Sequence, residues 1–211
     1  MKTIIYLVRH ADKEKDLFAN VQPIDTRQIS DEKCILSIEG EERAKEFANI
    51  SELENIQFVY TSNYVRTFST AKYIAKKKKI KVLIDSRLGK TKEGIESNDR
   101  LPDDYFIKQW ENLNYKIGNG ESINETSVRV NECFNEIINR HKGKNILIVA
   151  HGSSIASLFT QIGVVKFKTT IEERKIYFKD ELIYEGKIKF TTLFKVELED
   201  NNVVAIKTIS F

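Results

Sequence analysis

Proline and glycine are scarce in this chain. Its 211 residues include two prolines and nine glycines. No internal repeat, low-complexity tract or Gly/Ser/Pro-rich stretch interrupts it, whereas a flexible linker between domains is built from such a stretch. One buried core is the ordinary arrangement at this length. We therefore expect residues 1–211 to form a single domain.

Cysteines and long apolar runs are also scarce. The two cysteines, Cys34 and Cys133, form no Cys-x-x-Cys pair and cannot build a disulfide framework, which fits a reducing cytosol. No apolar run approaches the roughly 18 residues of a membrane-spanning helix. The short run Ile4–Val8 meets Arg9 and His10 too early for the core of a signal peptide. These features predict a soluble cytoplasmic protein with no membrane partner.

Charge of one sign is not in large excess. The formal net charge is +3, which is too small to predict nucleic-acid binding through release of counterions. The one basic run, residues 76–79, follows a helical pattern. Lysines at the C-terminal end of a helix are favoured by the helix dipole, so this run is typical of a solvated helix end. We expect no nucleic-acid partner.

What the chain does contain is an alternation of strand and helix patterns. Short apolar or alternating runs predict strands over residues 4–8, 56–60, 80–84 and 146–150. Apolar residues at helical spacing predict helices over residues 37–50, 63–78, 121–140 and 154–161, the first with Ser37 as N-cap. Residues 192–198 and 203–209 predict a closing antiparallel hairpin. This order is typical of an α/β fold, a three-layer α/β/α sandwich with a mostly parallel central sheet.

One long segment lacks a regular pattern. Residues 85–119 contain Pro102, many charged residues and the aromatic side chains of Tyr105, Phe106 and Trp110. Long irregular segments in compact domains often carry functional loops. We expect an irregular excursion with short helices lying over a site.

Two of the three histidines follow predicted strands directly. His10 ends the run that starts at Ile4, and His151 follows the apolar run Ile146–Ala150. Ligands bind at the carboxyl ends of the strands in an open parallel sheet, so the two imidazoles could converge there. The third histidine, His141, ends a predicted helix, and we expect it on the surface.

Two arginines belong to the same predicted edge. Arg9 precedes His10, and Arg66 lies just past the strand at residues 56–60, in the first turn of the next helix. An unpaired buried guanidinium is costly, and a phosphate would satisfy it. Guanidinium groups bind phosphate with two parallel hydrogen bonds, and helix N-termini favour negative charge. The pattern therefore indicates phosphate chemistry.

Several motifs together resemble the histidine phosphatase superfamily, which includes cofactor-dependent phosphoglycerate mutases and broad-specificity phosphatases. They occur in the family's order over roughly residues 4–160, and they are Leu7-Val8-Arg9-His10, Leu36-Ser37-Ile38-Glu39-Gly40 with Ala44, Ser62-Asn63-Tyr64-Val65-Arg66-Thr67 with Thr70-Ala71, Gly120-Glu121-Ser122 with Arg129, and Val149-Ala150-His151-Gly152.

The resemblance implies a single histidine phosphatase-like domain, with residues 85–119 as the excursion over its site. It implies that His10 attacks phosphorus and forms a phosphohistidine, which water then cleaves. Arg9, Arg66 and His151 would gather the phosphoryl oxygens. The substrate would be a small-molecule phosphomonoester, and neither a metal nor another cofactor is expected.

The resemblance fails at the general acid. Many members carry a glutamate two residues after the leucine that corresponds to Leu88, and this chain has Lys90 there. Lysine is normally cationic, so we do not assign it the role of the acid. Glu93 is the nearest substitute, with Asp12 and Glu96 as alternatives, and leaving groups of low pKa need no strong acid. The alternative interpretation of Glu93, which we favour, is a solvated loop carboxylate.

Three further residues of the motifs have two interpretations each. Ser62 is either a helix N-cap or a phosphate contact. Glu121 is either a carboxylate favoured by the helix dipole or a partner that holds an arginine in place. Gly152 follows His151 in the last motif, and the resemblance assigns it to the phosphate or to the residues that support it.

Three functions compete at this point. Hydrolysis of phosphomonoesters is the leading prediction. A phosphoglycerate mutase would use the same centre, but it must retain a bisphosphate intermediate in a closed basic site, and residues 85–119 mix acidic residues with lysines. A catalytically weak phospholigand-binding protein is the third, because Lys90 stands at the acid position. Sugar phosphates, nucleotides and phosphoproteins all stay open as substrates, and the oligomeric state is left open.

Overall fold

The central sheet is the frame of the fold. The computed structural model of the chain describes residues 1–15, 26–95 and 101–210. Within them the sheet has the order β3-β2-β4-β1-β8-β9, with the strands β1 (Lys2–Arg9), β2 (Phe58–Thr61), β3 (Val82–Ile84), β4 (Asn145–Ala150), β8 (Leu193–Glu199) and β9 (Asn202–Ile209). The first four strands are parallel, and β8 and β9 each run antiparallel to the preceding neighbour. The mostly parallel sheet and its closing hairpin are confirmed.

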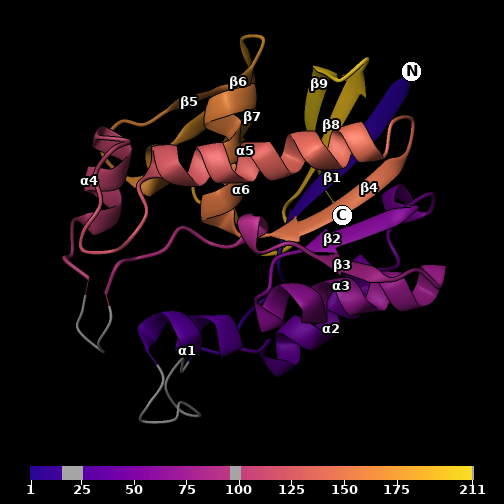
Figure 1. The fold of residues 1–211 in the computed structure, drawn as a ribbon, viewed down its shortest axis with the longest axis horizontal. Coiled ribbons are helices and arrows are strands. Elements are labelled where there is room, and N and C mark those ends of the chain that lie inside the picture. Colours follow the sequence, from indigo (N-terminus) through magenta and orange to yellow (C-terminus); the bar gives the residue numbers. More distant parts are fainter. Residues whose placement is uncertain (16–25, 96–100, 211) are drawn as a thin grey trace.

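Helices cover both faces of this sheet, as predicted for a three-layer fold. Figure 1 shows α5 (Ile123–Arg140) and α6 (Gly152–Ile162) on one face, and α2 (Ile38–Phe47) and α3 (Val65–Lys78) on the other. Most of the buried apolar side chains separate in the same way into two large clusters, and Ala11, Leu36 and Ala44 form a small third one. No helix in the described parts of the chain has the length and apolar character needed to cross a bilayer.

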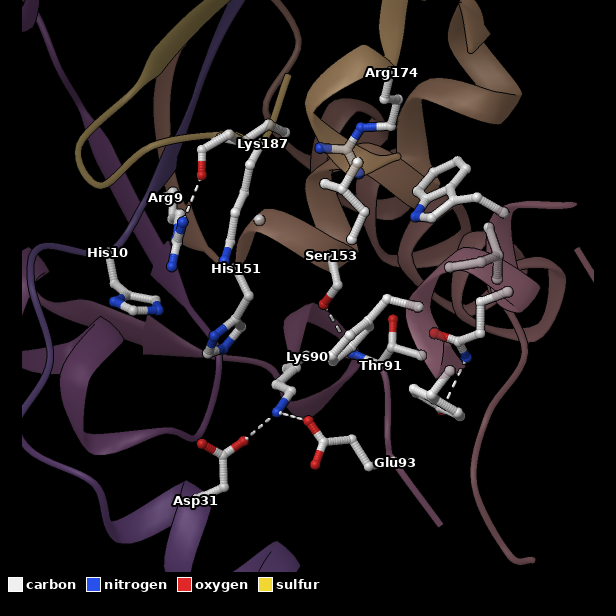
Figure 2. Close-up of a pocket in the computed structure, with 18 of the residues that line it drawn as sticks. Arg9, His10, Asp31, Lys90, Thr91, Glu93, His151, Ser153, Arg174 and Lys187 are labelled. Atoms are coloured by element: carbon white, nitrogen blue, oxygen red, sulfur yellow. Dashed lines mark hydrogen bonds and ion pairs between the residues drawn. The ribbon is translucent and has the colours of Figure 1, made fainter. Parts of the chain in front are cut away.

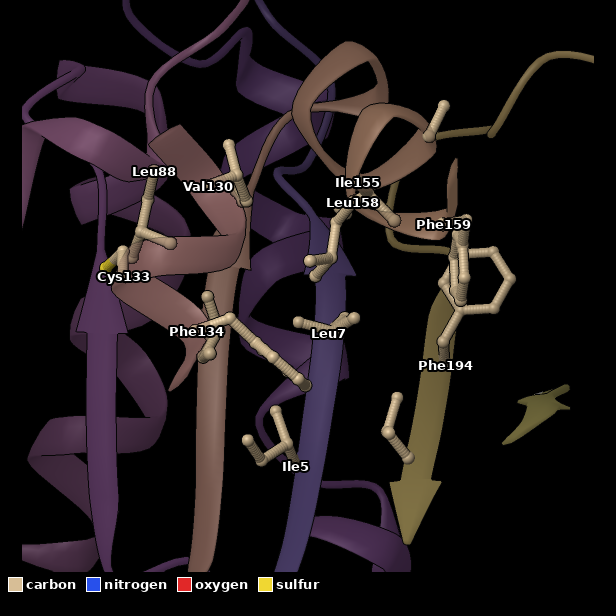
Figure 3. Packing of buried hydrophobic residues seen from close by; sticks show 14 of the residues in the cluster. Ile5, Leu7, Leu88, Val130, Cys133, Phe134, Ile155, Leu158, Phe159 and Phe194 are labelled. Atoms are coloured by element: carbon tan, nitrogen blue, oxygen red, sulfur yellow. The ribbon is translucent and has the colours of Figure 1, made fainter. Parts of the chain in front are cut away.

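Strand β1 explains why the first apolar run lacks a polar face. Ile5 and Leu7 point toward α5 and α6, where they join Phe134 in one cluster (Figure 3). Tyr6 and Val8 point the other way and join the cluster under α2 and α3. Successive side chains of a strand alternate between faces, so a strand covered on both sides is apolar throughout.

The start of α2 packs against the chain just beyond His10. Ser37 accepts a hydrogen bond from the Gly40 backbone N–H at 3.1 Å, and the Ser37 N–H donates to the Asp12 carbonyl at 3.0 Å. A Cβ atom on Gly40 would lie 1.9 Å from that same carbonyl oxygen. Only glycine fits such a close approach of two backbones. The Leu-Ser-x-x-Gly motif therefore fixes the segment that follows the first site histidine.

The irregular segment at residues 85–119 contains short helices, as expected. A 3₁₀ turn covers Ser86–Leu88 and α4 covers Tyr105–Glu111, while residues 96–100 lie outside the described parts. Tyr105 and Trp110 of α4 are buried. They contribute to the cavity described below.

Two elements were not predicted. One is the short helix α1 (Arg27–Lys33), and the other is a three-stranded antiparallel sheet of β5 (Val164–Lys166), β6 (Lys175–Phe178) and β7 (Glu181–Glu185). The turn between β6 and β7 has positive φ at Lys179 and Asp180, 48° and 66°. Tight hairpin turns of this kind normally carry Asn-Gly or Asp-Gly, so Lys-Asp gave no turn signal.

The expectation that His141 lies on the surface was wrong. Its ring is only 9% exposed, its Nε2 lies 2.7 Å from the hydroxyl of Tyr60, and it stacks on Phe58 at 3.8 Å. The end of α5 packs against β2. The imidazole can be buried there because the Tyr60 hydroxyl provides a hydrogen-bond partner for its Nε2.

Candidate active site

Adjacent parallel strands bring the two strand-end histidines together. In the ladder between β1 and β4, Arg9 stands opposite Ala150, so His10 and His151 leave the sheet side by side. The His10 N–H donates to the Ala150 carbonyl at 3.0 Å, which extends the ladder by one residue. The ring centroids are 5.2 Å apart. Both imidazoles are buried, with 3% and 2% of each residue exposed.

Arg66 joins the two histidines. It is the second residue of α3 and is 2% exposed. Its Nε donates to His10 Nε2 at 3.1 Å, and its Nη2 lies 3.4 Å from His151 Nδ1. Its Nη1 donates to the Asp31 carbonyl and forms an ion pair with the Asp31 carboxylate at 3.3 Å. The guanidinium therefore contacts both imidazole rings and is itself held by Asp31.

These contacts fix the tautomer of His10. A guanidinium can only donate, so His10 Nε2 must present its lone pair to Arg66. A backbone carbonyl can only accept, so His10 Nδ1, 2.7 Å from the Ala11 oxygen, carries the proton. His10 is neutral, and Nε2 is the unprotonated nitrogen, whose lone pair accepts the hydrogen bond from Arg66 Nε.

The same logic applies to His151. Its Nδ1 faces Arg66, so Nε2 carries the proton and donates to Ser62 Oγ at 2.8 Å. Ser62 Oγ lies 2.8 Å from Thr67 Oγ1, and Thr67 donates onward to the Tyr64 carbonyl at 2.7 Å. Ser62 is thus not the N-cap of α3, which is Tyr64. It holds the His151 ring in its orientation.

Burial and charge keep both rings neutral. Burial, followed by the positive charges of Arg66 and Arg9, holds the pKa of His10 well below its ordinary value of 6.5. Burial, followed by Arg66, does the same to the pKa of His151. An imidazole must be unprotonated to act as a nucleophile, and His10 meets that condition at neutral pH.

We expect the free energy of unfolding to fall as the pH decreases from about 6.5 to 5. In that range the unfolded chain binds protons on its histidines, whereas the folded chain does not, so each buried neutral imidazole contributes about 1.4 kcal/mol per pH unit. Denaturant titrations at several pH values check this. The His10→Asn variant should show a slope smaller by the share of one imidazole, and an unchanged slope would contradict a neutral buried His10.

Arg9 is held over the site by the segment that follows β7. Its Nη1 donates to the Ile188 carbonyl at 2.5 Å, and its guanidinium carbon lies 4.0 Å from the centre of the Phe190 ring. Its Nε has no hydrogen-bond partner among the described residues. Burial and repulsion from Arg66 lower the pKa of Arg9 to about 10, so it stays cationic at neutral pH. A buried cation with an unused donor is suited to an anionic ligand.

Gly152 begins α6 directly after His151, so the helix N-terminus opens onto the same site. A Cβ atom there would lie 3.4 Å from Arg9 Cδ. A Cβ atom there would therefore be in van der Waals contact with the arginine. The absence of a side chain leaves the space beside Arg9 open.

A cluster of ion pairs occupies the opposite wall, where the general acid was expected. Lys90 Nζ lies 3.0 Å from Asp31 Oδ2 and also contacts Glu93 Oε1 (Figure 2). Glu93 accepts a second bond from Arg27 Nε at 3.0 Å. Although burial raises the pKa of Glu93, Lys90 and Arg27 lower it more, and the net shift is downward. Glu93 therefore faces the site as a carboxylate rather than as an acid.

The other two candidates for the acid fare differently. Asp12 forms an ion pair with Arg43 at 3.0 Å and is absent from the cavity wall. Glu96 lies outside the described residues. Asp31, which the sequence did not single out, lines the cavity, but Lys90 and Arg66 outweigh its burial and lower its pKa to about 2.

Glu121 holds an arginine, which is the second of its two interpretations. Both its oxygens bind Arg129, at 2.8 and 2.7 Å from Nε and Nη2. Arg129 in turn donates to the carbonyls of Arg87, Gly89 and Lys90. The pair fixes the loop that carries Lys90, and Glu121 itself is not part of the cavity wall.

The site opens into a cavity of about 310 Å³. Its wall includes Arg9, His10, Arg66 and His151 on the side of the sheet, Lys90 and Glu93 on the second side, and Trp110, Arg174 and Lys187 on the third. Figure 2 shows Arg174 and Lys187 on the side opposite Asp31, Lys90 and Glu93. No sequence pattern indicated Arg174, because it precedes a strand that was not predicted. Among the described residues, no group of three or more His, Cys, Asp or Glu side chains is placed to hold a metal ion.

Comparison with known proteins shows the family to which the chain belongs. The sequence model of the histidine phosphatase superfamily (branch 1) matches residues 5–171. The chain belongs to this superfamily. All four of the residues assigned by resemblance, Arg9, His10, Arg66 and His151, fall inside the match.

Relatives within the histidine phosphatase superfamily are named either as phosphatases or as probable phosphoglycerate mutases. The chain is 24% identical over 164 residues to phosphoserine phosphatase 1 of Hydrogenobacter thermophilus, covering 74% of each chain. It is 26% identical over 167 residues to probable phosphoglycerate mutase GpmB of Escherichia coli O1:K1, covering 75% of this chain and 74% of the relative. Mycobacterial glucosyl-3-phosphoglycerate phosphatase shares the fold with a TM-score of 0.68 at 16% identity, over 99% of this chain and 97% of that one.

Proposed function

We propose that the protein hydrolyses small-molecule phosphomonoesters through a phosphohistidine on His10. The observation that supports this is the tautomer of His10, whose unprotonated Nε2 accepts a hydrogen bond from Arg66 on the wall of the cavity. Nε2 attacks phosphorus, and the bond from phosphorus to the ester oxygen breaks. Water then cleaves the bond between phosphorus and nitrogen, which releases inorganic phosphate and restores His10.

Arg9, Arg66 and His151 act on the transferred phosphoryl group in this proposal. The unused Nε of Arg9 and the fork of Arg66 bind its oxygens, and the N-terminus of α6 at Gly152 adds backbone N–H donors. Charge spreads over these oxygens in the transition state. Fixed cations supply the stabilisation, so we propose that the reaction needs no metal or other cofactor.

Ser62 and Glu121 act as positioning residues. Ser62 Oγ accepts a hydrogen bond from His151 Nε2, which orients the ring so that Nδ1 faces Arg66. Glu121 fixes Arg129, which holds the backbone at Lys90. Neither touches the transferred group.

This chain differs from many relatives at the step in which the leaving group departs. Glu93 and Asp31 are ionised at neutral pH, and Lys90 is a cation between them. A cation beside the ester oxygen stabilises a leaving group that departs as an anion. We therefore propose a preference for esters with leaving groups of low pKa, such as phenols and enols.

The domain organisation, the location and the partners of the protein are proposed from its sequence and structure in the same way. We propose a single domain over residues 1–211, with residues 85–119 forming part of the cavity wall. A cytoplasmic location is consistent with Cys34 and Cys133, which are both buried and free. A net charge of +3 gives no reason to propose a nucleic-acid partner.

Trapping the covalent intermediate tests the proposal. The protein is mixed with para-nitrophenyl phosphate, quenched in alkali and analysed by peptide mass spectrometry, with inorganic phosphate release measured in parallel. We expect one phosphoryl group on His10 that is stable in alkali and lost in mild acid. Turnover with no phosphoenzyme would contradict the mechanism. Binding of phosphate with neither phosphoenzyme nor turnover would favour the phospholigand-binding protein.

Phosphoglycerate mutase is the second candidate. The similarity to probable phosphoglycerate mutase GpmB favours it, and Arg174 and Lys187 add positive charge to the cavity wall. A mutase must return the phosphoryl group to its substrate faster than water removes it. Comparing the rate of phosphoglycerate interconversion with the rate of phosphate release separates the two, and faster interconversion would reverse our ranking.

A further inference from the structure

Arg174 lines the cavity without a role in the proposed reaction. It stands just before β6 and is 4% exposed. Its Nη2 donates to the Gly186 carbonyl at 3.1 Å, and its Nε has no hydrogen-bond partner among the described residues. Its guanidinium carbon lies 4.9 Å from the centre of the Trp110 ring. The arginine is therefore fixed in place but incompletely satisfied.

The charge of Arg174 is not neutralised by a neighbouring carboxylate. No described ion pair includes it, and the carboxylate of Glu172 acts on it only weakly. Burial, which is the main cause, and repulsion from Arg9 lower the pKa of Arg174 to about 10. It remains a cation at neutral pH. A buried guanidinium with an unused donor is costly unless an anion binds there.

The segment after β7 holds Arg174 and Arg9 close together. Arg174 is anchored on the carbonyl of Gly186, and Arg9 on that of Ile188. Two residues of extended chain span at most about 7 Å. Lys187 lies between the two anchors and also lines the cavity. The two hydrogen-bonded guanidinium nitrogens are therefore at most roughly 13 Å apart, on the wall of one cavity.

Trp110 gives this second position a rigid wall. It is 9% exposed and contacts both the guanidinium of Arg174 and the ring of Phe167, whose centroid is 6.5 Å away. Stacking on an aromatic face holds a guanidinium in a fixed orientation toward its ligand. The fork of Arg174 is therefore preorganised for a planar or tetrahedral oxyanion.

We propose that Arg174 binds a second anionic group of the substrate, a carboxylate or a second phosphate, and so selects compact phosphomonoesters that carry one. This rests on the proposed phosphatase function and adds the substrate class. The residue directly precedes strand β6 of the three-stranded sheet β5-β6-β7, most of which lies beyond the part of the chain that the family model matches. The selectivity would be a property of this chain.

Matched substrate pairs test the inference. Phosphoserine is compared with phosphoethanolamine, the phosphate ester of salicylic acid with phenyl phosphate, and ethylene glycol bisphosphate with ethyl phosphate. The first two pairs test a carboxylate, and the third tests a second phosphate. We expect wild type to prefer the doubly anionic member of at least one pair. In Arg174→Gln the ratio of kcat/KM within that pair should fall about 10- to 100-fold, the range of a charge-assisted bidentate contact.

Two further variants make the result decisive. Arg174→Lys keeps the charge without the fork, so the ratio should fall less than in Arg174→Gln, and it supplies the comparison if the glutamine variant does not fold. Lys189→Gln removes a cation from the same segment outside the cavity wall and should leave the ratio unchanged. Equal losses for both members of every pair would overturn the inference while leaving the phosphatase intact. Absence of turnover on every substrate would instead count against the proposed function.

Discussion

Replacing His10 with alanine lowers kcat for every phosphomonoester by about 10⁴-fold or more. In the proposed mechanism the imidazole is the nucleophile, and its unprotonated Nε2 is the atom that lies against Arg66 Nε. Without it, water must attack the ester directly, with only binding and charge stabilisation remaining. The measurement is steady-state turnover of para-nitrophenyl phosphate, together with the trapped phosphoenzyme, which should be absent from the variant.

The chain offers a matched control. His141→Asn also removes a buried histidine, but that ring contacts Tyr60 and Phe58 rather than the cavity. We expect it to lower the thermal midpoint and to leave kcat nearly unchanged. If His10→Ala retained turnover comparable with that of His141→Asn, the phosphohistidine mechanism would be wrong.

The main sheet was predictable because its strands obey simple rules. The runs at residues 4–8 and 146–150 are apolar throughout, and both faces of β1 and β4 are covered by helices. The sheet β5-β6-β7 escaped prediction because its strands are short and half-exposed, and its Lys-Asp turn carries no glycine. Helix α1 is short and polar, and its position depends on Arg66 binding Asp31.

The site was predictable where it depends on the sheet and not where it depends on loops. His10 and His151 follow from the rule that ligands bind at the carboxyl ends of parallel strands. Asp31 and Arg174 reach the same cavity from α1 and from the start of β6, two places that no local pattern marks. The role of Glu121 was visible only as one of two interpretations, because its partner Arg129 is two helical turns away.

Lys90 shows how one residue can change the chemistry of a shared centre. Its ammonium group lies where many relatives place a carboxylic acid, and it pairs with Asp31 and Glu93. In this position lysine keeps both carboxylates ionised, so neither can donate a proton. We therefore expect slow hydrolysis of alkyl esters, whose leaving alkoxides need a proton. Hydrolysis of aryl esters should be little affected, because their leaving phenoxides do not need one.

Replacing Lys90 with glutamate should raise kcat/KM for alkyl phosphates by about 100-fold relative to aryl phosphates, the lower range for general acid catalysis. A glutamate there would stand among the carboxylates of Asp31 and Glu93. Three carboxylates sharing one site cannot all ionise easily, so the pKa of one of them rises toward neutrality. The new acid must be protonated to donate, so activity on ethyl phosphate should fall as the pH rises through that pKa.

The control for this change is Lys90→Gln, which removes the same cation without adding an acid. It should lower activity on para-nitrophenyl phosphate, since the leaving phenoxide loses a stabilising charge, and should give no gain on ethyl phosphate. A gain of equal size in both variants would mean that Lys90 merely obstructs alkyl substrates. A gain confined to Lys90→Glu, with a new decrease in activity at high pH, would mean that the site lacks only a general acid for alkyl esters.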